Sequence, residues 1–279
     1  MLGYLVRGAL LLGLAAPVAA SECTARDFLA MPLPPTEGRP AVSVALETAY
    51  PGLFVDDGQA SVYMPDGATV LPLGDMTGRP PARLLETPTI VEQFAYPYPL
   101  AFDLDARRTP WVDPGRPRNP DFFEALYFSA QAEAARSLRT VTYAPTGTRF
   151  YLTDKTCAAT QLDAALQAIA AQGVDYGRFF QSVGGSFNWR RISGTTRLSA
   201  HSFGIALDLN AELGGYWRWS GATAGQVGAY DNQIPEGIVS ALERHGFVWG
   251  GKWHHFDGMH FEYRPELILH ARLTRAPQG

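Results

Sequence analysis

Alternating apolar and polar side chains mark two strands in the C-terminal half of the chain. Over residues 205–210, isoleucine and leucine side chains alternate with a face that carries Asp208. Over residues 259–263, His260 and Glu262 share one face, and apolar or aromatic side chains occupy the other. Because successive side chains of a strand point to opposite faces, the first segment predicts a half-buried strand with a carboxylate on its open face, and the second predicts a strand with His260 and Glu262 on one face.

Apolar residues at helical spacing predict three helices, over residues 121–138, 160–172 and 235–246. The second helix begins with Thr160-x-x-Asp163, which has the spacing of a capping box. The third begins with a proline, which is favoured in the first helical turn, and each of the last two ends at a glycine.

Residues 32–118 contain many prolines and glycines, which predict loops and short strands and little helix. One hairpin is expected there, with strands over residues 60–64 and 69–73 joined by the turn at residues 65–67. Since the strands of the C-terminal half are close in sequence, we expect them to pair antiparallel. The predicted fold class is α+β: a small antiparallel sheet with flanking helices, preceded by a loop- and strand-rich N-terminal extension.

The first 20 residues have the pattern of a secretory signal peptide. Arg7 is followed by an apolar run over residues 9–16, and Val18 and Ala20 suit the small-residue positions of a signal peptidase site. The run is shorter than the roughly 18 apolar residues of a spanning helix, which disfavours the alternative of an uncleaved anchor. We therefore expect cleavage near Ala20 and a periplasmic or extracellular protein.

The rest of the chain is long for one compact domain. We expect an N-terminal extension over residues 21–120, whose role the sequence does not indicate, and a second domain over residues 121–279.

Charge and composition exclude some classes of partner. A net charge of −4 provides no basic field for nucleic acid, and no later apolar segment is long enough to span a membrane. Cys23 and Cys157 are either unpaired thiols or, in an exported protein, one disulfide. We expect a monomer.

Two polar clusters in the C-terminal half contain a candidate metal site. His201, Asp208 and His260 supply the three protein ligands of a catalytic Zn²⁺, which keeps a fourth position for water. Small residues, Gly204 and Ala206, stand between the first two ligands. We interpret them as keeping the metal face free of bulk, so that the His201 loop can fold back over the strand.

Peptide hydrolysis also needs a group that takes the proton of the attacking water. Asp257 precedes His260 by three residues, an offset that can place its carboxylate beside a metal-bound water. The simpler alternative is that Asp257 only caps the turn before the next glycine. Glu262 is a rival base, although its position on the His260 face favours a hydrogen bond to that ligand. We expect Trp253 to wall the cleft and His255 to contact substrate.

The motif Ser199-x-His201-x-x-Gly204-x-Ala206-x-Asp208, followed by Asp257-x-x-His260, resembles a family of zinc peptidases. That family comprises the vancomycin-resistance D-alanyl-D-alanine dipeptidases and carboxypeptidases and the phage L-alanyl-D-glutamate endolysins, and it shares its fold with the hedgehog signalling domain. The resemblance covers about residues 174–267, which we take as the core of a peptidase domain. It implies that His201, Asp208 and His260 bind Zn²⁺, that Asp257 is the acid/base, that Arg190 stabilises the oxyanion, and that Ser199 contacts substrate.

The resemblance implies a secreted zinc peptidase that hydrolyses an amide bond in peptidoglycan stem peptides. Members that cleave D-alanyl-D-alanine generally have Glu at the position of Asp257, whereas endolysin-like members have Asp. A D-alanyl-D-alanine carboxypeptidase and an L-alanyl-D-glutamate endopeptidase therefore both stay open. The alternative class is a non-catalytic zinc-containing module that binds peptidoglycan. A structural zinc site would have four protein ligands, and the sequence offers three.

Overall fold

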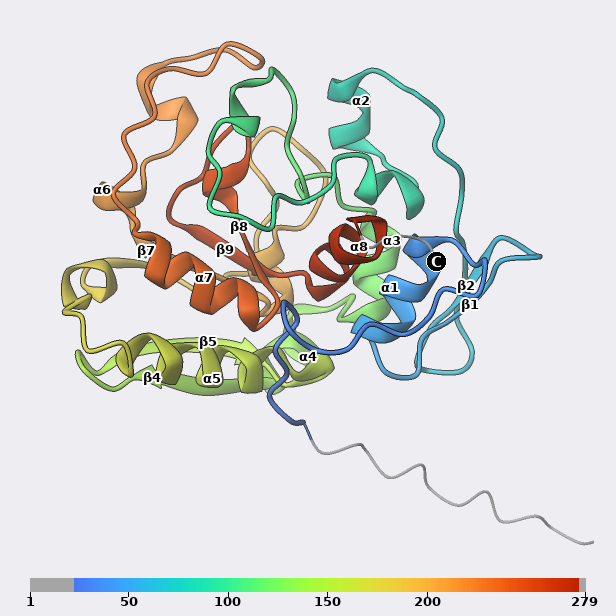
Figure 1. Ribbon diagram of the computed structural model, residues 1–279, viewed down its shortest axis with the longest axis horizontal. Helices are drawn as coiled ribbons and strands as arrows, with labels where there is room; N and C mark the ends of the chain where they lie inside the picture. Colours follow the sequence, from blue (N-terminus) through green and yellow to red (C-terminus); the bar gives the residue numbers. More distant parts are fainter. Residues whose placement is uncertain (1–22, 276–279) are drawn as a thin grey trace, which may run out of the picture.

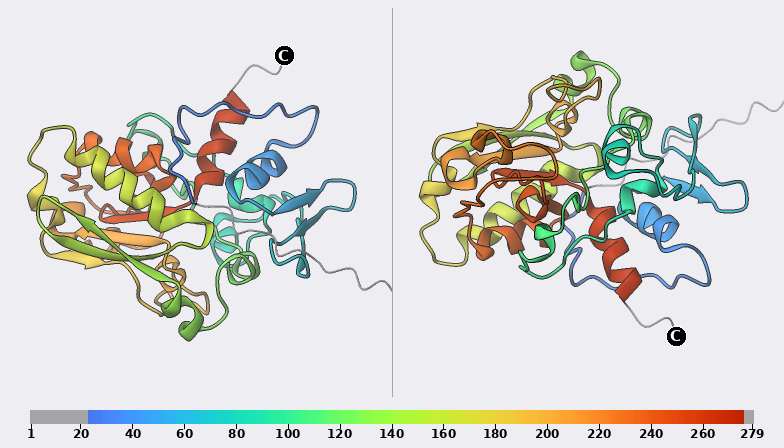
Figure 2. Two further views of the ribbon diagram at one scale, coloured as in Figure 1. Left: turned by 90° about the horizontal axis from the view of Figure 1, so that it is seen from below. Right: turned by 90° about the horizontal axis from the view of Figure 1, so that it is seen from above.

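The computed structural model describes residues 23–275, and Figure 1 and Figure 2 show it from three sides. The predicted signal peptide lies outside the described residues, so its cleavage near Ala20 stays a prediction. The architecture is α+β, as predicted, with small antiparallel sheets and flanking helices.

The central sheet has four strands in the order β6-β7-β9-β8, and all neighbours are antiparallel, as predicted. Its strands are β6 (Val183–Gly185), β7 (Ala206–Asn210), β9 (His260–Tyr263) and β8 (Phe247–Trp249). The two strands predicted from alternation are thus neighbours in the middle of the sheet. On one face Leu207 and Phe261 are register partners, and both are fully buried. The same pairing brings Asp208 and His260 together on the other face.

A second layer lies below the central sheet in Figure 1. It consists of the hairpin of β4 (Leu138–Tyr143) and β5 (Thr148–Thr153), with α5 (Ala158–Ala170) beside it and α7 (Glu236–Arg244) packed against α5. The helices predicted over residues 160–172 and 235–246 are therefore present with slightly shifted bounds. Gly173 and Gly246 follow them with φ of +69° and +87°, the left-handed conformation in which glycine ends helices.

The capping box predicted at Thr160-x-x-Asp163 is wrong. Helix α5 begins at Ala158, directly after Cys157, whose backbone is left-handed with φ of +68°. Thr160 lies inside the helix, and its hydroxyl donates to Asp154 Oδ1 at 3.3 Å. The preceding turn, and no side-chain cap, sets the start of this helix.

The single helix predicted over residues 121–138 is also wrong. The segment forms α3 (Pro120–Leu126) and α4 (Gln131–Arg136), and Leu138 already belongs to β4. At the break, Tyr127 leaves the helical conformation with φ −111° and ψ −91°, and its carbonyl oxygen accepts from Lys155 Nζ at 2.6 Å. That partner lies outside the segment, so the apolar spacing within the segment does not reveal the break.

The N-terminal extension contains more helix than predicted. It includes α1 (Ala41–Ala49), which packs against α8 (Pro265–Arg275), and α2 (Pro81–Glu86). Proline precedes or begins α1 and α2, in positions where a helix requires no backbone N–H. Three of the prolines that suggested loops, Pro40, Pro80 and Pro81, therefore stand at helix starts.

The hairpin predicted in the extension is confirmed. β2 (Ser61–Tyr63) pairs with β3 (Val70–Pro72), and β1 (Phe54–Asp56) adds a third antiparallel strand. This sheet lies on the right of Figure 1, and α1 lies between it and α8. Buried side chains of the extension belong to the same apolar core as those of the central sheet. The division of the chain at residue 120 stays a prediction.

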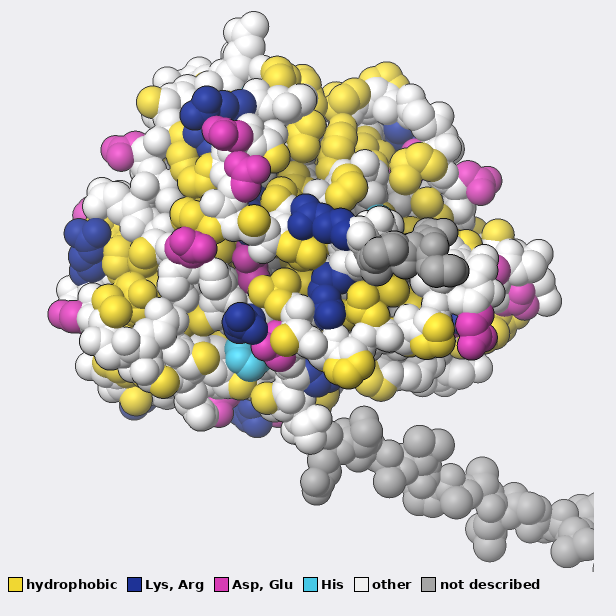
Figure 3. Space-filling view, in the orientation of Figure 1, with side chains coloured by type: hydrophobic (Ala, Val, Ile, Leu, Met, Phe, Trp, Pro, Cys, Tyr) yellow, Lys and Arg dark blue, Asp and Glu magenta, His cyan; other side chains and the backbone are white. Residues whose placement is uncertain are grey.

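Short helices complete the connections between these elements. They are η1 (Val91–Phe94), η2 (Ala106–Arg108), η3 (Lys155–Cys157), η4 (Gly177–Phe180), η5 (Ala200–Phe203), α6 (Ala211–Gly214), η6 (Trp217–Ser220) and η7 (Gly250–Lys252). A disulfide joins Cys23 to Cys157, with 5.3 Å between the Cα atoms, which confirms the predicted pairing. Within residues 23–275, no helix is long and apolar enough to cross a membrane. On the face drawn in Figure 3, cationic and anionic side chains are interspersed.

Candidate metal centre

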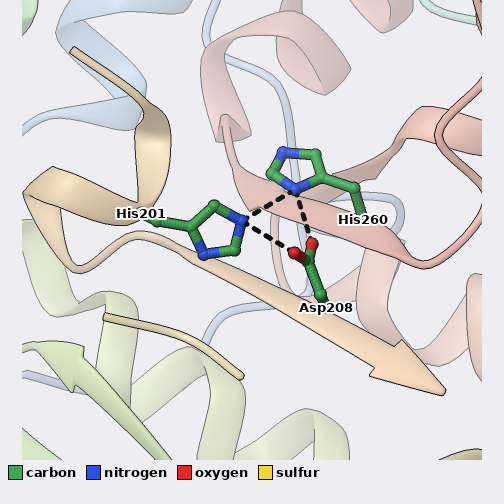
Figure 4. Close-up of side chains that lie close together, drawn as sticks. All are labelled: His201, Asp208 and His260. Carbon is green, nitrogen blue, oxygen red and sulfur yellow. Dashed lines mark hydrogen bonds and ion pairs between the residues drawn. The ribbon is translucent and has the colours of Figure 1, made fainter. Parts of the chain in front are cut away.

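Two central strands and one short helix bring three potential ligands together. Asp208 on β7 and His260 on β9 are register partners, so their side chains emerge on the same face of the sheet. His201 lies in η5, directly before the turn into β7. Figure 4 shows the three side chains pointing toward one another.

The glycines near these ligands have roles that differ from the predicted ones. Gly204 has φ of +67°, and a Cβ there would lie 2.8 Å from Leu138 Cδ2 and 3.1 Å from the backbone nitrogen of Thr153. Gly204 thus allows the turn to pack against the β4–β5 hairpin, and the interpretation that it clears the metal face is wrong. Gly184 on β6 has a closer relation to the site, since a Cβ there would lie 2.7 Å from Asp208 Cβ.

The three ligand atoms form a tight triangle. His201 Nε2 lies 3.2 Å from His260 Nδ1 and 3.2 Å from Asp208 Oδ2. His260 Nδ1 lies 2.9 Å from Asp208 Oδ1. A tetrahedral zinc ion with bonds of about 2.0–2.1 Å holds its ligand atoms roughly 3.3 Å apart. The triangle therefore has about the right size for such an ion, and among the described residues this is the group with metal-binding geometry.

Hydrogen bonds behind the two rings aim one nitrogen of each at the centre. His201 Nδ1 contacts the carbonyl oxygen of Ser186, which can only accept, so this nitrogen carries a proton. His260 Nε2 donates to Glu262 Oε2 at 3.1 Å, the bond that the sequence favoured for this carboxylate. In neutral imidazoles, the remaining nitrogens then direct lone pairs at each other and at Asp208. A positive charge, either a proton or a metal ion, is needed between them.

Charges around the triangle favour a cation. Burial raises the pKa of Asp208, but His201 and His260 outweigh burial and hold that pKa well below its usual value. Burial also raises the pKa of Glu262, and Arg118 and His260 together hold it well below the usual range. Both carboxylates are therefore ionised at neutral pH. Against the effect of burial, hydrogen bonds that the His260 ring donates to these carboxylates raise the pKa of His260 to about 10.

Asp257 lies in the turn that leads into β9, as predicted. Its backbone N–H donates to the Gly250 carbonyl at 3.0 Å, and its own carbonyl accepts from the His260 N–H at 3.1 Å. Its carboxylate is outside the ligand group, and Oδ1 is buried without a hydrogen-bond partner in the described part of the chain. Burial raises the pKa of Asp257 to about 6, although His260 opposes the rise. A buried oxygen of this kind is suited to meet a bound water or substrate.

All the residues predicted for the site line one cleft of about 520 Å³. They are Arg190, Ser199, His201, Asp208, Trp253, His255, Asp257 and His260. The structure thus brings together side chains that are spread over some seventy positions of the sequence.

Arg190 and Ser199 are held by a small network of backbone bonds. The Ser199 N–H donates to the Arg190 carbonyl at 3.0 Å, and Ser202 Oγ accepts from the Arg190 N–H at 3.0 Å. Ser199 is buried, whereas Arg190 is exposed. The backbone of Arg190 is therefore held in place, and the residue lines the cleft.

His255 and Trp253 form a rigid wall. His255 Nδ1 bonds Asp113 Oδ2 at 2.6 Å, and His255 Nε2 accepts from the Gly225 N–H at 2.8 Å. Both ring nitrogens of His255 are thus engaged within the protein, which leaves neither for a substrate hydrogen bond. Trp253 Nε1 donates to the Pro114 carbonyl at 2.7 Å, and its ring lies 5.7 Å from the His260 ring.

Two arginines of the cleft that were not predicted from the sequence, Arg116 and Arg118, come from the N-terminal extension. Arg118 Nε donates to Glu262 Oε1 at 3.0 Å, across 144 positions of the sequence. Arg116 lies over the Trp253 ring, with its Cζ 5.5 Å from the ring centroid. The one sequence feature that could have pointed to them is a pair of arginines on either side of Pro117, shortly before α3. No local pattern links that pair to β9.

Residues 193–263 match a family model described as D-alanyl-D-alanine carboxypeptidase. The matched segment contains the three potential ligands and also Ser199 and Asp257, whereas Arg190 and the arginines of the extension precede it. No curated protein and no solved structure matches the chain. Peptidases of this family are metal-dependent, and the His201, Asp208 and His260 group can bind a metal ion. The match supports a peptidase of that family for the segment that carries the metal site.

Proposed function

We propose that this protein is a zinc-dependent peptidase that hydrolyses an amide bond in the stem peptides of bacterial peptidoglycan. The observation that carries this proposal is the triangle of His201, Asp208 and His260 beside the unpartnered carboxylate oxygen of Asp257 in one cleft. A purely structural metal site needs no such oxygen, and a catalytic site does.

Each cleft residue has a defined part in this proposal. Bound Zn²⁺ would polarise the attacking water and the scissile carbonyl. Asp257 accepts the proton of the water through its free oxygen and passes it to the leaving amine. Arg190 places a positive charge near the oxygen of the scissile carbonyl, where negative charge develops. Ser199 and Trp253 line the part of the cleft that holds the substrate.

We further propose that the protein acts as a monomer outside the cytoplasm, in the periplasm or the extracellular space. The predicted signal peptide and the bond between Cys23 and Cys157 support export, because disulfides persist in oxidising compartments. The small net charge of −4 gives no support to a nucleic-acid partner.

Two observations bear on which peptide bond is cut, and they favour different bonds. The family match favours a D-alanyl-D-alanine carboxypeptidase. The shorter Asp257 in place of Glu is typical of L-alanyl-D-glutamate endopeptidases. We propose the carboxypeptidase, because the cleft also contains arginines that suit a free carboxylate.

The test is digestion of defined muropeptides by the mature protein, first metal-free and then reloaded with zinc, with products identified by mass spectrometry. Zinc-dependent loss of one terminal alanine would support the carboxypeptidase. A fragment that begins at D-glutamate would identify the endopeptidase instead. Binding of muropeptides without any cleavage would favour a non-catalytic binding module.

A matched variant separates catalysis from binding. Asp257→Asn removes the proposed base and keeps the size of the side chain. We expect turnover to fall by about 10²- to 10⁴-fold while zinc content and peptide affinity stay unchanged. Unchanged turnover in this variant would contradict the assigned role of Asp257.

A further inference from the structure

The cleft is lined by more positive charges than the proposed reaction uses, which needs Arg190 alone. Arg116, Arg118, Arg190 and Arg197 all line this cleft. Arg118 is paired with Glu262. Within residues 23–275, the other three guanidinium groups have no carboxylate at salt-bridge distance, so none of them is held in a direct ion pair.

Arg197 is the most unusual of these side chains. Its Nε and Nη1 are buried and find no acceptor in the described part of the chain. Burial lowers the pKa of the guanidinium to about 10, and the nearby charges of Arg118 and Arg116 act in the same direction. An unpaired cation in such surroundings is unfavourable in the free protein. A ligand that brings a negative charge removes this penalty.

Arg116 is held close to the metal centre by partners that carry no charge. Its Nη1 donates to the backbone carbonyl of His255, and its guanidinium lies over the Trp253 ring. The centroid of the Trp253 ring also lies 5.7 Å from that of the His260 ring. Arg116 and a predicted zinc ligand are thus both neighbours of the same indole ring.

We propose that Arg116 and Arg197 form an anion subsite that binds a carboxylate group of the peptide substrate beside the metal centre. This inference rests on the proposed peptidase function. A guanidinium fork matches the planar geometry of a carboxylate and binds it through charge-assisted hydrogen bonds. The carboxylate is either the C-terminal group of the residue that is released or an acidic group within the stem peptide. In both cases the N-terminal extension, through Arg116, supplies part of the substrate specificity.

The test compares three peptides with the zinc-loaded full-length mature protein. One is a stem pentapeptide with a free C-terminus, the second has that terminus amidated, and the third has its internal carboxylates amidated. We expect Arg197→Gln and Arg116→Gln each to raise KM for the free peptide by about tenfold or more, as loss of a charged hydrogen bond does. The amidated form that lacks the recognised group should bind weakly to the wild type and be insensitive to both substitutions.

Two further variants serve as controls. Arg191→Gln removes one positive charge next to Arg190, but Arg191 is exposed and outside the cleft lining, so its kinetics should match the wild type. Arg197→Lys keeps the charge and should lose less affinity than Arg197→Gln. Because Arg197 has no ion pair within residues 23–275, Arg197→Gln should also keep or raise the melting temperature. A structural role for Arg197 would lower the melting temperature and leave KM unchanged, which would overturn the proposal.

The outcomes for the subsite and for the peptidase are distinguishable. If no peptide is cleaved, isothermal titration calorimetry of the same three peptides against the zinc-loaded protein measures the subsite alone. Weaker binding of one amidated peptide, and of the free peptide to Arg197→Gln, would support the subsite although the peptidase had failed. Equal affinity for all three peptides, or equal effects of Arg191→Gln and Arg197→Gln, would overturn it even in an active peptidase.

Discussion

His260 Nδ1 lies 2.9 Å from Asp208 Oδ1 across the pairing of β7 with β9, and the two residues are register partners. The metal triangle is therefore built into the centre of the sheet, where neighbouring strands restrict its movement. The other ring nitrogen of His260 is hydrogen-bonded to Glu262, and Arg118 and Arg264 donate hydrogen bonds to the same carboxylate. The ligand set and its supporting charges form one continuous network.

Removal of the carboxylate ligand should abolish metal binding. Asp208→Asn replaces an ionised oxygen with a weak neutral ligand, so we expect the bound zinc per chain to fall close to zero after dialysis. Metal analysis by mass spectrometry measures it. Asp163→Asn on the exposed side of α5 removes the same charge and should retain the wild-type zinc content. Full zinc occupancy in Asp208→Asn would show that the ion sits elsewhere.

Glu262→Gln should weaken zinc binding without removing a ligand. The substitution takes the negative charge from the partner of His260 Nε2, and such changes cost about 10- to 100-fold in metal affinity. It also leaves Arg118 without its carboxylate, so we expect the free energy of unfolding to fall by about 3 kcal/mol. Chelator competition and urea unfolding measure the two effects. Glu124→Gln, at an exposed position of α3, is the matched control, and equal behaviour of the two variants would contradict the network.

His270 should make stability depend on pH. Burial alone lowers the pKa of this ring from 6.5 to about 4 in the fold, where it lies against Phe94. The unfolded chain therefore binds the proton first as pH falls, so stability is complete above pH 6.5 and declines between pH 6.5 and 4. The loss is at most about 3 kcal/mol. Urea unfolding at pH 7 and pH 5 should show a smaller decline in His270→Gln than in the wild type. Parallel pH profiles would refute this assignment.

Reduction of the disulfide should destabilise the fold. The bond between Cys23 and Cys157 closes a loop with a sequence separation of 134, and cross-links of long loops contribute about 2–5 kcal/mol. We expect a lower melting temperature in reductant for the wild type. The double variant Cys23→Ala and Cys157→Ala should melt at that lower temperature with or without reductant. A wild type that is insensitive to complete reduction would contradict the prediction.

The sequence by itself determined the local part of this protein. Alternation over residues 205–210 and 259–263 was enough to predict two strands, and the shared face of His260 and Glu262 follows directly from the two-residue period. The turn at residues 65–67 and the helix-ending glycines are equally local. In each case the physical cause lies within a few residues of its effect.

Only the tertiary structure decided features that depend on distant parts of the chain. Tyr127 interrupts a helical pattern at the point where its carbonyl oxygen accepts from distant Lys155. The turn at Cys157 sets the start of a helix in place of a nearby capping pattern. Arg118 reaches Glu262 because the extension folds back onto the central sheet. These contacts join residues that are far apart in the sequence and that only the folded chain brings together in the interior. No periodicity or motif within one segment can therefore predict them.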